Sequence, residues 1–180
     1  MRKRLVLLPV LAMAMWLLGS GSAFASGGST FGWHAGDSLL AGLGFPTPDV
    51  AMADNGDTVT VAASGSFDVA AKSATGGGTF EHRAPDGTLR AIGTLTATKL
   101  IDFQPFGCNG SLCGGRAAIL THLVGHPASD PSQTVEADAI LVVICDVGSP
   151  PPGQMEGIRL NVQDLINFNN SVSGVTVFLQ

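Results

Sequence analysis

Four histidines and three cysteines are the residues of this 180-residue chain best suited to catalysis or metal binding. His122 and His126 have the spacing that places two imidazoles on one face of a helix, as in zinc proteases. On a strand the same spacing separates the side chains by about 13 Å, which is too far for one metal ion with bonds of about 2 Å. The stretch also lacks a third ligand and a glutamate between the histidines. We therefore predict a histidine pair at a strand surface or strand end, and no metal site.

His82 directly follows Glu81, a pairing that suggests a carboxylate–histidine dyad. Neighbours on a strand point to opposite faces, so these two side chains cannot pair with each other. His82 shares its face with Phe80, which directs it toward the protein interior. There it is either a hydrogen-bonded core residue, the interpretation we favour, or a cavity acid or base. His82 is therefore the one candidate for a catalytic residue. His34 falls in a segment without a clear element, and we expect it to be solvated.

The cysteines lie in "FGCNGSLCGG", which holds Cys108 and Cys113, and in a later strand that holds Cys145. Three thiols without a histidine at ligand spacing make a poor zinc site, so we expect one disulfide and one free thiol. Closing Cys108 to Cys145 contributes about 4 kcal/mol through chain entropy, against about 2 kcal/mol for the short loop. We predict a Cys108–Cys145 disulfide, with Cys113 as the alternative partner of Cys145 and a Cys108–Cys113 bridge as third choice.

The N-terminal residues have the pattern of a secretory signal peptide. The basic residues 2–4 precede an apolar run over residues 5–18, and residues 23–25 read Ala-Phe-Ala. The run is shorter than the roughly 20 apolar residues that a membrane-spanning helix needs. We predict a cleaved signal helix over residues 1–25, with Ser26 as the first mature residue. The protein is then secreted, either to a periplasm or to the extracellular medium.

The mature chain is acidic. Removal of the signal peptide takes away three of the nine Lys and Arg residues and none of the 14 Asp and Glu residues, which leaves a net charge of −8 with neutral histidines. Nucleic acids and anionic membranes bind Lys/Arg patches, so we expect neither as a partner. No tyrosine and one tryptophan, Trp33, remain, which disfavours carbohydrate and peptide platforms. No dinucleotide or calcium-loop motif is present, and we predict no cofactor.

Apolar and polar residues alternate through most of the mature chain, as they do in strands. Residues 57–71 place valine, alanine and phenylalanine on one face and threonine, serine and aspartate on the other. In residues 135–147 the middle is apolar on both faces, so we expect a central strand or one with a covered outer face. The remaining predicted strands, separated by turns such as "APDG", lie at residues 79–83, 88–103, 116–124, 157–162 and 174–179.

These strands predict an all-β domain over residues 49–180, preceded by an irregular, Gly- and Ser-rich arm over residues 26–48. No segment after the signal predicts a long amphipathic helix. Long, bent, threonine-rich strands in successive hairpins favour a single antiparallel β-barrel of seven to eight strands. A β-sandwich is the alternative.

Three stretches carry a resemblance to known proteins: "MADNGDTVTVAASGSFD", "GGGTFEHRAPDGTLRAIGTLTATKL" and "EGIRLNV…INFNNSVSGVTVF". They resemble segments of uncharacterised small secreted bacterial all-β proteins, a family that brings no established activity and so implies no active-site residues. The architecture alone is also similar to the dirigent and allene oxide cyclase barrels. Those are eight-stranded antiparallel barrels whose cavity guides small apolar substrates, and no motif here carries their functional residues across.

The sequence therefore predicts a secreted, non-enzymatic β-barrel that binds a small apolar ligand or a partner surface. The first alternative is a cavity enzyme of cyclase or isomerase type, in which His82 or an inward-facing acid transfers a proton. Such an enzyme works mainly by shape and leaves no motif. The second alternative is a structural, envelope-associated protein with an exposed apolar patch. The sequence assigns no oligomeric state.

Overall fold

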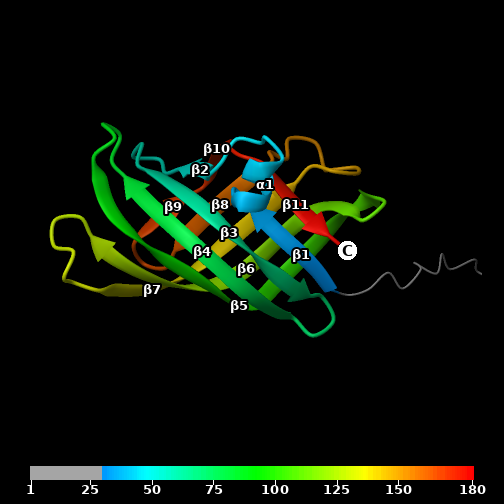
Figure 1. Ribbon diagram of the computed structural model, residues 1–180, viewed down its shortest axis with the longest axis horizontal. Coiled ribbons are helices and arrows are strands. Elements are labelled where there is room, and N and C mark those ends of the chain that lie inside the picture. The colour runs from blue at the N-terminus through cyan, green and yellow to red at the C-terminus, as the bar shows by residue number, and fades with distance from the viewer. Residues whose placement is uncertain (1–29) are drawn as a thin grey trace, which may run out of the picture.

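The computed structural model describes residues 30–180, so the predicted signal peptide lies outside the described residues. This part of the chain is all-β with one short helix (Figure 1). All seven predicted strands are present, because their alternating residues bury one face of each strand. In chain order the elements are β1 (Thr30–Ala35), α1 (Ser38–Gly42), β2 (Asp49–Met52), β3 (Thr58–Asp68), β4 (Ser73–Arg83), β5 (Leu89–Asn109), β6 (Leu112–Pro127), β7 (Val135–Cys145), β8 (Gly157–Val162), β9 (Ile166–Phe168), β10 (Asn170–Ser173) and β11 (Thr176–Leu179).

The strands form one antiparallel sheet that closes partly into a ring and so builds a β-barrel. β3 pairs with β4, β4 with β5 and β5 with β6 through long ladders. β6 then pairs with β11, β11 with β1 and β1 with β3, which completes the ring at one end of the molecule. The predicted antiparallel all-β architecture is confirmed.

Different strands surround the opposite end of the barrel. β7 and β8 continue the sheet from β6, while β2 and β10 continue it from β3. β8 lies against both β2 and β10, so the two edges of the sheet approach each other there. The barrel therefore has two unlike ends, one closed by β1 and β11 and one bordered by the ends of β4, β6 and β8.

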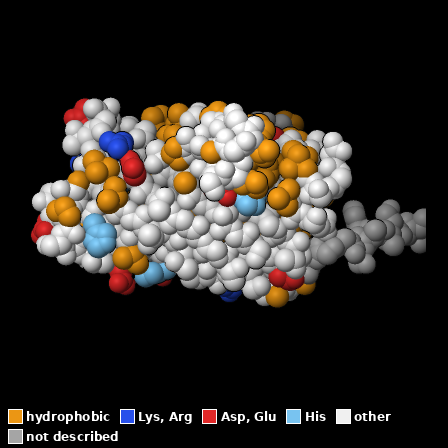
Figure 2. Space-filling view, viewed as in Figure 1, with side chains coloured by type: hydrophobic (Ala, Val, Ile, Leu, Met, Phe, Trp, Pro, Cys, Tyr) orange, Lys and Arg blue, Asp and Glu red, His pale blue; other side chains and the backbone are white. Residues whose placement is uncertain are grey.

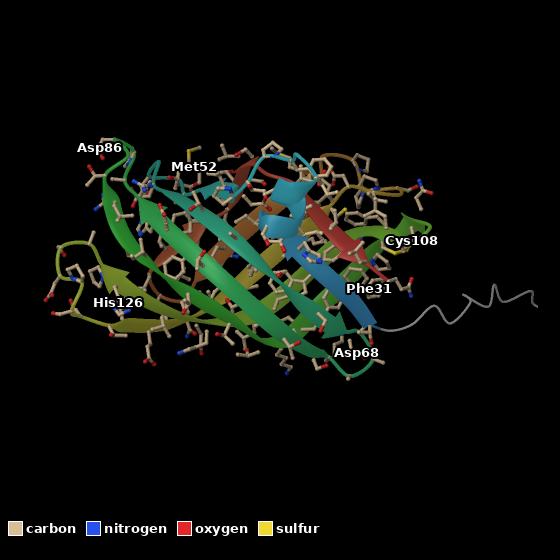
Figure 3. The ribbon with its side chains drawn as sticks, viewed as in Figure 1. Phe31, Met52, Asp68, Asp86, Cys108 and His126 are labelled. Carbon is tan, nitrogen blue, oxygen red and sulfur yellow. A yellow bond between two sulfur atoms is a disulfide. The ribbon has the colours of Figure 1, made fainter. Side chains whose placement is uncertain are left out.

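Aromatic side chains fill the end where β1 and β11 close the ring. The ring of Phe67 lies 5.4 Å from that of Phe31, 4.9 Å from that of Phe103 and 5.7 Å from that of Phe178. In Figure 3, Phe31 and Cys108 mark this end, and Asp86 and His126 mark the other. Because these rings pack against one another, they leave the interior of this end solid.

The second half of β7, residues 141–145, is buried on both faces, as its apolar sequence predicts. Leu141 and Val143 face the main core. On the outer face Val142 and Ile144 pack with Phe106 in a second, smaller apolar cluster. This cluster holds the last residues of β5 against the outside of the sheet.

The prediction of an irregular arm over residues 26–48 is wrong in the part that the structure describes. Phe31, Trp33 and Ala35 are buried on one face of β1, and Leu40 is buried on α1. The alternation is short and lies among glycines and serines, so the composition of the arm concealed it. β1 and three other short strands, β2, β9 and β10, raise the strand number above the predicted seven to eight. Within residues 30–180 no helix is long and apolar enough to cross a membrane.

Candidate functional site

A cavity of about 230 Å³ opens at the end of the barrel opposite the aromatic cluster. Its wall is mostly apolar, and two polar side chains, those of His82 and Arg90, line part of it. At the left end of the view in Figure 2, where the β4–β5 turn lies, hydrophobic and acidic side chains are both exposed. The apolar wall includes Leu123, Ala137, Leu160, Val162, Ile166 and Phe168.

Glycines shape the wall of this cavity around Phe80. A Cβ atom on Gly93 would stand 2.8 Å from Cε1 of Phe80, and one on Gly125 would stand 3.2 Å from its Cζ. The two residues face each other on β5 and β6. Without side chains they leave room for the ring of Phe80 to lie against the sheet, and the space beside the ring stays open.

His82 is the second-last residue of β4, next to the β4–β5 turn. It faces the cavity on the same side as Phe80. Its ring packs edge-on against Phe168, with 5.2 Å between the centroids and 81° between the planes. Its Nε2 lies 2.8 Å from Oδ2 of Asp57. A carboxylate only accepts hydrogen bonds, so Nε2 carries the hydrogen of this contact. The ring is thereby held in one orientation at the polar edge of the cavity.

Asp57 reaches His82 from the turn between β2 and β3. The turn is held by the N–H of Gly56, which donates to the carbonyl of Ala53 at 2.9 Å, and by the N–H of Asp57, which donates to Oδ1 of Asn55 at 3.0 Å. These bonds make residues 54–57, Asp-Asn-Gly-Asp, a tight turn. The side chain of Asp57 is only 5% exposed. Sequence reasoning missed it as a partner of His82, although its odd-numbered position shares the inward face of Val59.

Arg90 completes the polar edge because of a β-bulge. In the β4–β5 ladder His82 pairs with Ala91 and Arg83 pairs with Leu89, so Arg90 is the unpaired extra residue. A bulge re-aims the side chain it carries, and Nε of Arg90 lies 3.2 Å from Oδ2 of Asp57. Simple alternation places Arg90 on the outer face. The bulge brings it to the cavity, and half of its side chain stays exposed.

The histidine pair His122 and His126 lies on β6, away from the cavity wall. His122 Nδ1 is 3.1 Å from Asp138 Oδ1, and its Nε2 is 3.5 Å from Glu136 Oε2. His126 instead approaches the carbonyl of Gln133 at 3.0 Å. The two histidines, both on β6, thus have separate partners. Across residues 30–180 no group of three or more His, Cys, Asp or Glu side chains is placed to hold a metal ion.

His34 was expected to be solvated, and this prediction is wrong. Its Nδ1 lies 2.6 Å from Oδ2 of Asp37, the N-cap of α1, whose Oδ1 accepts from the N–H of Leu40 at 3.2 Å. Burial raises the pKa of Asp37, but the hydrogen bonds from His34, Leu40 and Ser64 outweigh it and hold that pKa below its ordinary value. This cluster ties α1 to the outside of the barrel, where Ser64 pairs with His34 across β3 and β1.

The predicted Cys108–Cys145 disulfide and its alternative Cys113–Cys145 are also wrong, and the third choice, Cys108–Cys113, is present. Cys108 is bonded to Cys113 directly opposite it in the β5–β6 ladder, with 4.0 Å between the Cα atoms. Cys145 lies on β7, on the far side of β6, and is a free, buried thiol whose pKa burial raises. Two strand spacings separate β5 from β7 by about 9.5 Å, beyond the roughly 7 Å that a disulfide spans. The ranking of possible disulfides by chain entropy takes no account of the distance between strands.

Together these features define a partly closed antiparallel β-barrel with an apolar end cavity and a His–Asp–Arg cluster at its polar edge. No family model, curated protein or solved structure matches the chain. The resemblance to small secreted bacterial all-β proteins stays a prediction from the three quoted stretches.

Proposed function

We propose that the protein binds a small, largely apolar molecule in the end cavity. The observation that carries this proposal is the cavity itself: about 230 Å³ of space with an almost entirely apolar wall. Because a water molecule takes about 30 Å³ in the liquid, the cavity holds a ligand on the order of ten non-hydrogen atoms. Burial of such a ligand against apolar walls is favourable in proportion to the area it removes from water.

The export predicted from the sequence supports the same role. The predicted signal peptide directs the chain out of the cytoplasm, and the Cys108–Cys113 disulfide is of the kind that persists in oxidising compartments. A secreted carrier of this kind meets apolar molecules at low concentration. A pre-formed cavity binds them without the entropic cost of ordering a loop.

A second candidate function, a cavity enzyme of cyclase or isomerase type, is favoured by one specific observation. His82 lines the cavity and has a buried carboxylate partner in Asp57. A histidine oriented by a carboxylate is a common acid–base group in enzymes. In this function His82 takes a proton from a bound ligand and returns it at another position. Loss of turnover with unchanged binding in a His82→Gln variant would support the enzyme over the carrier.

The binding proposal is tested with a homologous series of alkylbenzenes, from toluene to hexylbenzene, by isothermal titration calorimetry. Each added methylene should tighten binding about fourfold, up to the length at which the cavity is full, and the affinity should then level off. The plateau distinguishes a cavity of fixed size from an exposed apolar surface, on which the gain continues with chain length.

Two phenylalanine variants locate the binding. Ala137→Phe places a ring in the cavity, since Ala137 forms part of its wall, and should abolish measurable binding. Thr94→Phe adds the same ring at an exposed position of β5 and should leave the affinity unchanged. Equal binding by both variants, or no binding of any alkylbenzene by the wild type, would refute the proposal.

A further inference from the structure

His82 has one ring nitrogen without a protein partner. Nε2 is bound to Asp57, but Nδ1 has no hydrogen-bond partner among residues 30–180 and is not sealed from solvent. The ring lines the cavity, and Nδ1 is the ring nitrogen that Asp57 leaves for a molecule bound there. In the neutral ring with hydrogen on Nε2, Nδ1 is an acceptor, so it needs a hydrogen-bond donor from the ligand.

The charges around the cavity mouth select against an ionised ligand. The positive charge of Arg90 is already matched by Asp57 at 3.2 Å, and Arg90 also interacts with Asp86. Asp54 and Asp164 line an adjoining hollow that shares wall residues with the cavity. The excess of carboxylates repels an anionic headgroup. An ammonium group is attracted to the mouth but must lose its hydration in an apolar chamber, which is costly.

A neutral hydroxyl group avoids both of these costs. It donates one hydrogen bond, which matches the acceptor at Nδ1 of His82, and its desolvation is offset by that bond. We propose that the ligand is a small apolar alcohol or phenol whose hydroxyl group donates to Nδ1 of His82. This inference rests on the proposed function and adds the ligand's polar group to it.

The test compares three probes that share a para-propylphenyl group by calorimetry on the mature protein at neutral pH. They are para-propylphenol, its methyl ether para-propylanisole and para-propylbenzoate. The phenol should bind about five- to tenfold more tightly than the ether, because one net hydrogen bond changes the affinity by about this factor. The benzoate should bind most weakly, because the carboxylates at the mouth repel it.

Two variants assign the preference to His82. His82→Phe keeps a planar ring but removes the acceptor, so the phenol and the ether should bind with equal affinity. The ether itself should bind as tightly as it does to the wild type. His122→Phe is the matched control: it changes an exposed histidine on the outer face of β6 and should keep the full preference.

If the His82→Phe variant does not fold, a measurement on the wild type tests the same contact. In protein labelled with nitrogen isotope in histidine, NMR should show one Nδ1 resonance that shifts on addition of the phenol and stays in place with the ether. Equal affinity for phenol and ether, or tightest binding of the benzoate, overturns the inference while the cavity still binds apolar molecules. Failure of all three probes and of the alkylbenzenes overturns the proposed function itself.

Discussion

The carboxyl group of Asp49 is buried at the start of β2. We therefore expect the protein to be more stable in mild acid than at neutral pH. The residue is 0% exposed. Its Oδ1 accepts from the N–H of Val175 at 3.0 Å, while Oδ2 has no partner within the described residues. Burial, aided by the nearby charges of Glu156 and Asp37, raises the pKa of Asp49 from 3.8 to about 7.

The direction of the effect follows from which state binds the proton. Below about pH 4 Asp49 is protonated in the folded and the unfolded chain alike, so it does not disfavour folding. Between pH 4 and about 7 the unfolded chain ionises while the folded protein keeps its proton, and the free energy of unfolding falls as the pH rises. At 1.36 kcal/mol for each unit of pKa the loss amounts to about 4 kcal/mol, and it is complete about one unit above the folded pKa, near pH 8. Burial also raises the pKa of Glu156, which acts in the same direction.

Asp49→Asn removes the ionisation and keeps an amide oxygen to accept from Val175. We expect the variant to match the wild type near pH 4 and to exceed it by about 4 kcal/mol in free energy of unfolding near pH 8. Urea denaturation at intervals between these pH values measures the difference. Asp164→Asn is the control, since it changes an exposed carboxylate at a position whose positive φ of 58° asparagine adopts easily. Parallel pH profiles for wild type and Asp49→Asn would refute the reasoning.

Three further predictions concern the Cys108–Cys113 disulfide and the closed end of the barrel. Peptide mapping without reductant should recover a Cys108–Cys113 linked peptide, and Cys145 should resist alkylation until the protein unfolds, because its thiol is buried. Replacing both bonded cysteines with alanine should cost about 2 kcal/mol in urea denaturation, since the closed loop is short. Phe67→Ala should cost about 3–5 kcal/mol by removing a ring packed against three others. The affinity of that variant for alkylbenzenes should not change, and a loss would place the ligand among the aromatic rings instead.

The long strands could be predicted from the sequence because each one alternates over many residues. β3, β6 and β7 bury every second side chain against the barrel interior, and this period is visible without a structure. β2, β9 and β10 have three or four residues each, too few for a period to stand out. β2 and β9 pair with their sequence neighbours β3 and β8, but β10 pairs with β2, far earlier in the chain, and no local pattern encodes that pairing.

In the candidate site, too, some features follow from the local sequence and others from contacts between distant residues. The inward direction of His82 follows from its parity with Phe80, which is local information. Its partner Asp57 lies 25 residues earlier in the chain, and Arg90 reaches the site only because of a bulge that alternation does not reveal. The cysteine pairing failed for a related reason, since chain entropy ranks loops by length and not by which strand lies between them. Polar clusters built across strands therefore need the register of the sheet.

The cavity itself has a cause in the inward-facing residues at the two ends. At the closed end four phenylalanine rings occupy the interior. At the other end the inward positions of β5, β6 and β7 hold Ala91, Gly125 and Ala137, so the walls lack the side chains that would fill the space. An unfilled apolar volume costs stability in a protein that gains nothing from it. If Ala137→Phe raises the free energy of unfolding while it removes ligand binding, the space is one that the sequence keeps open at the expense of stability. A fall in stability on filling would instead show that the walls are already at their packing limit.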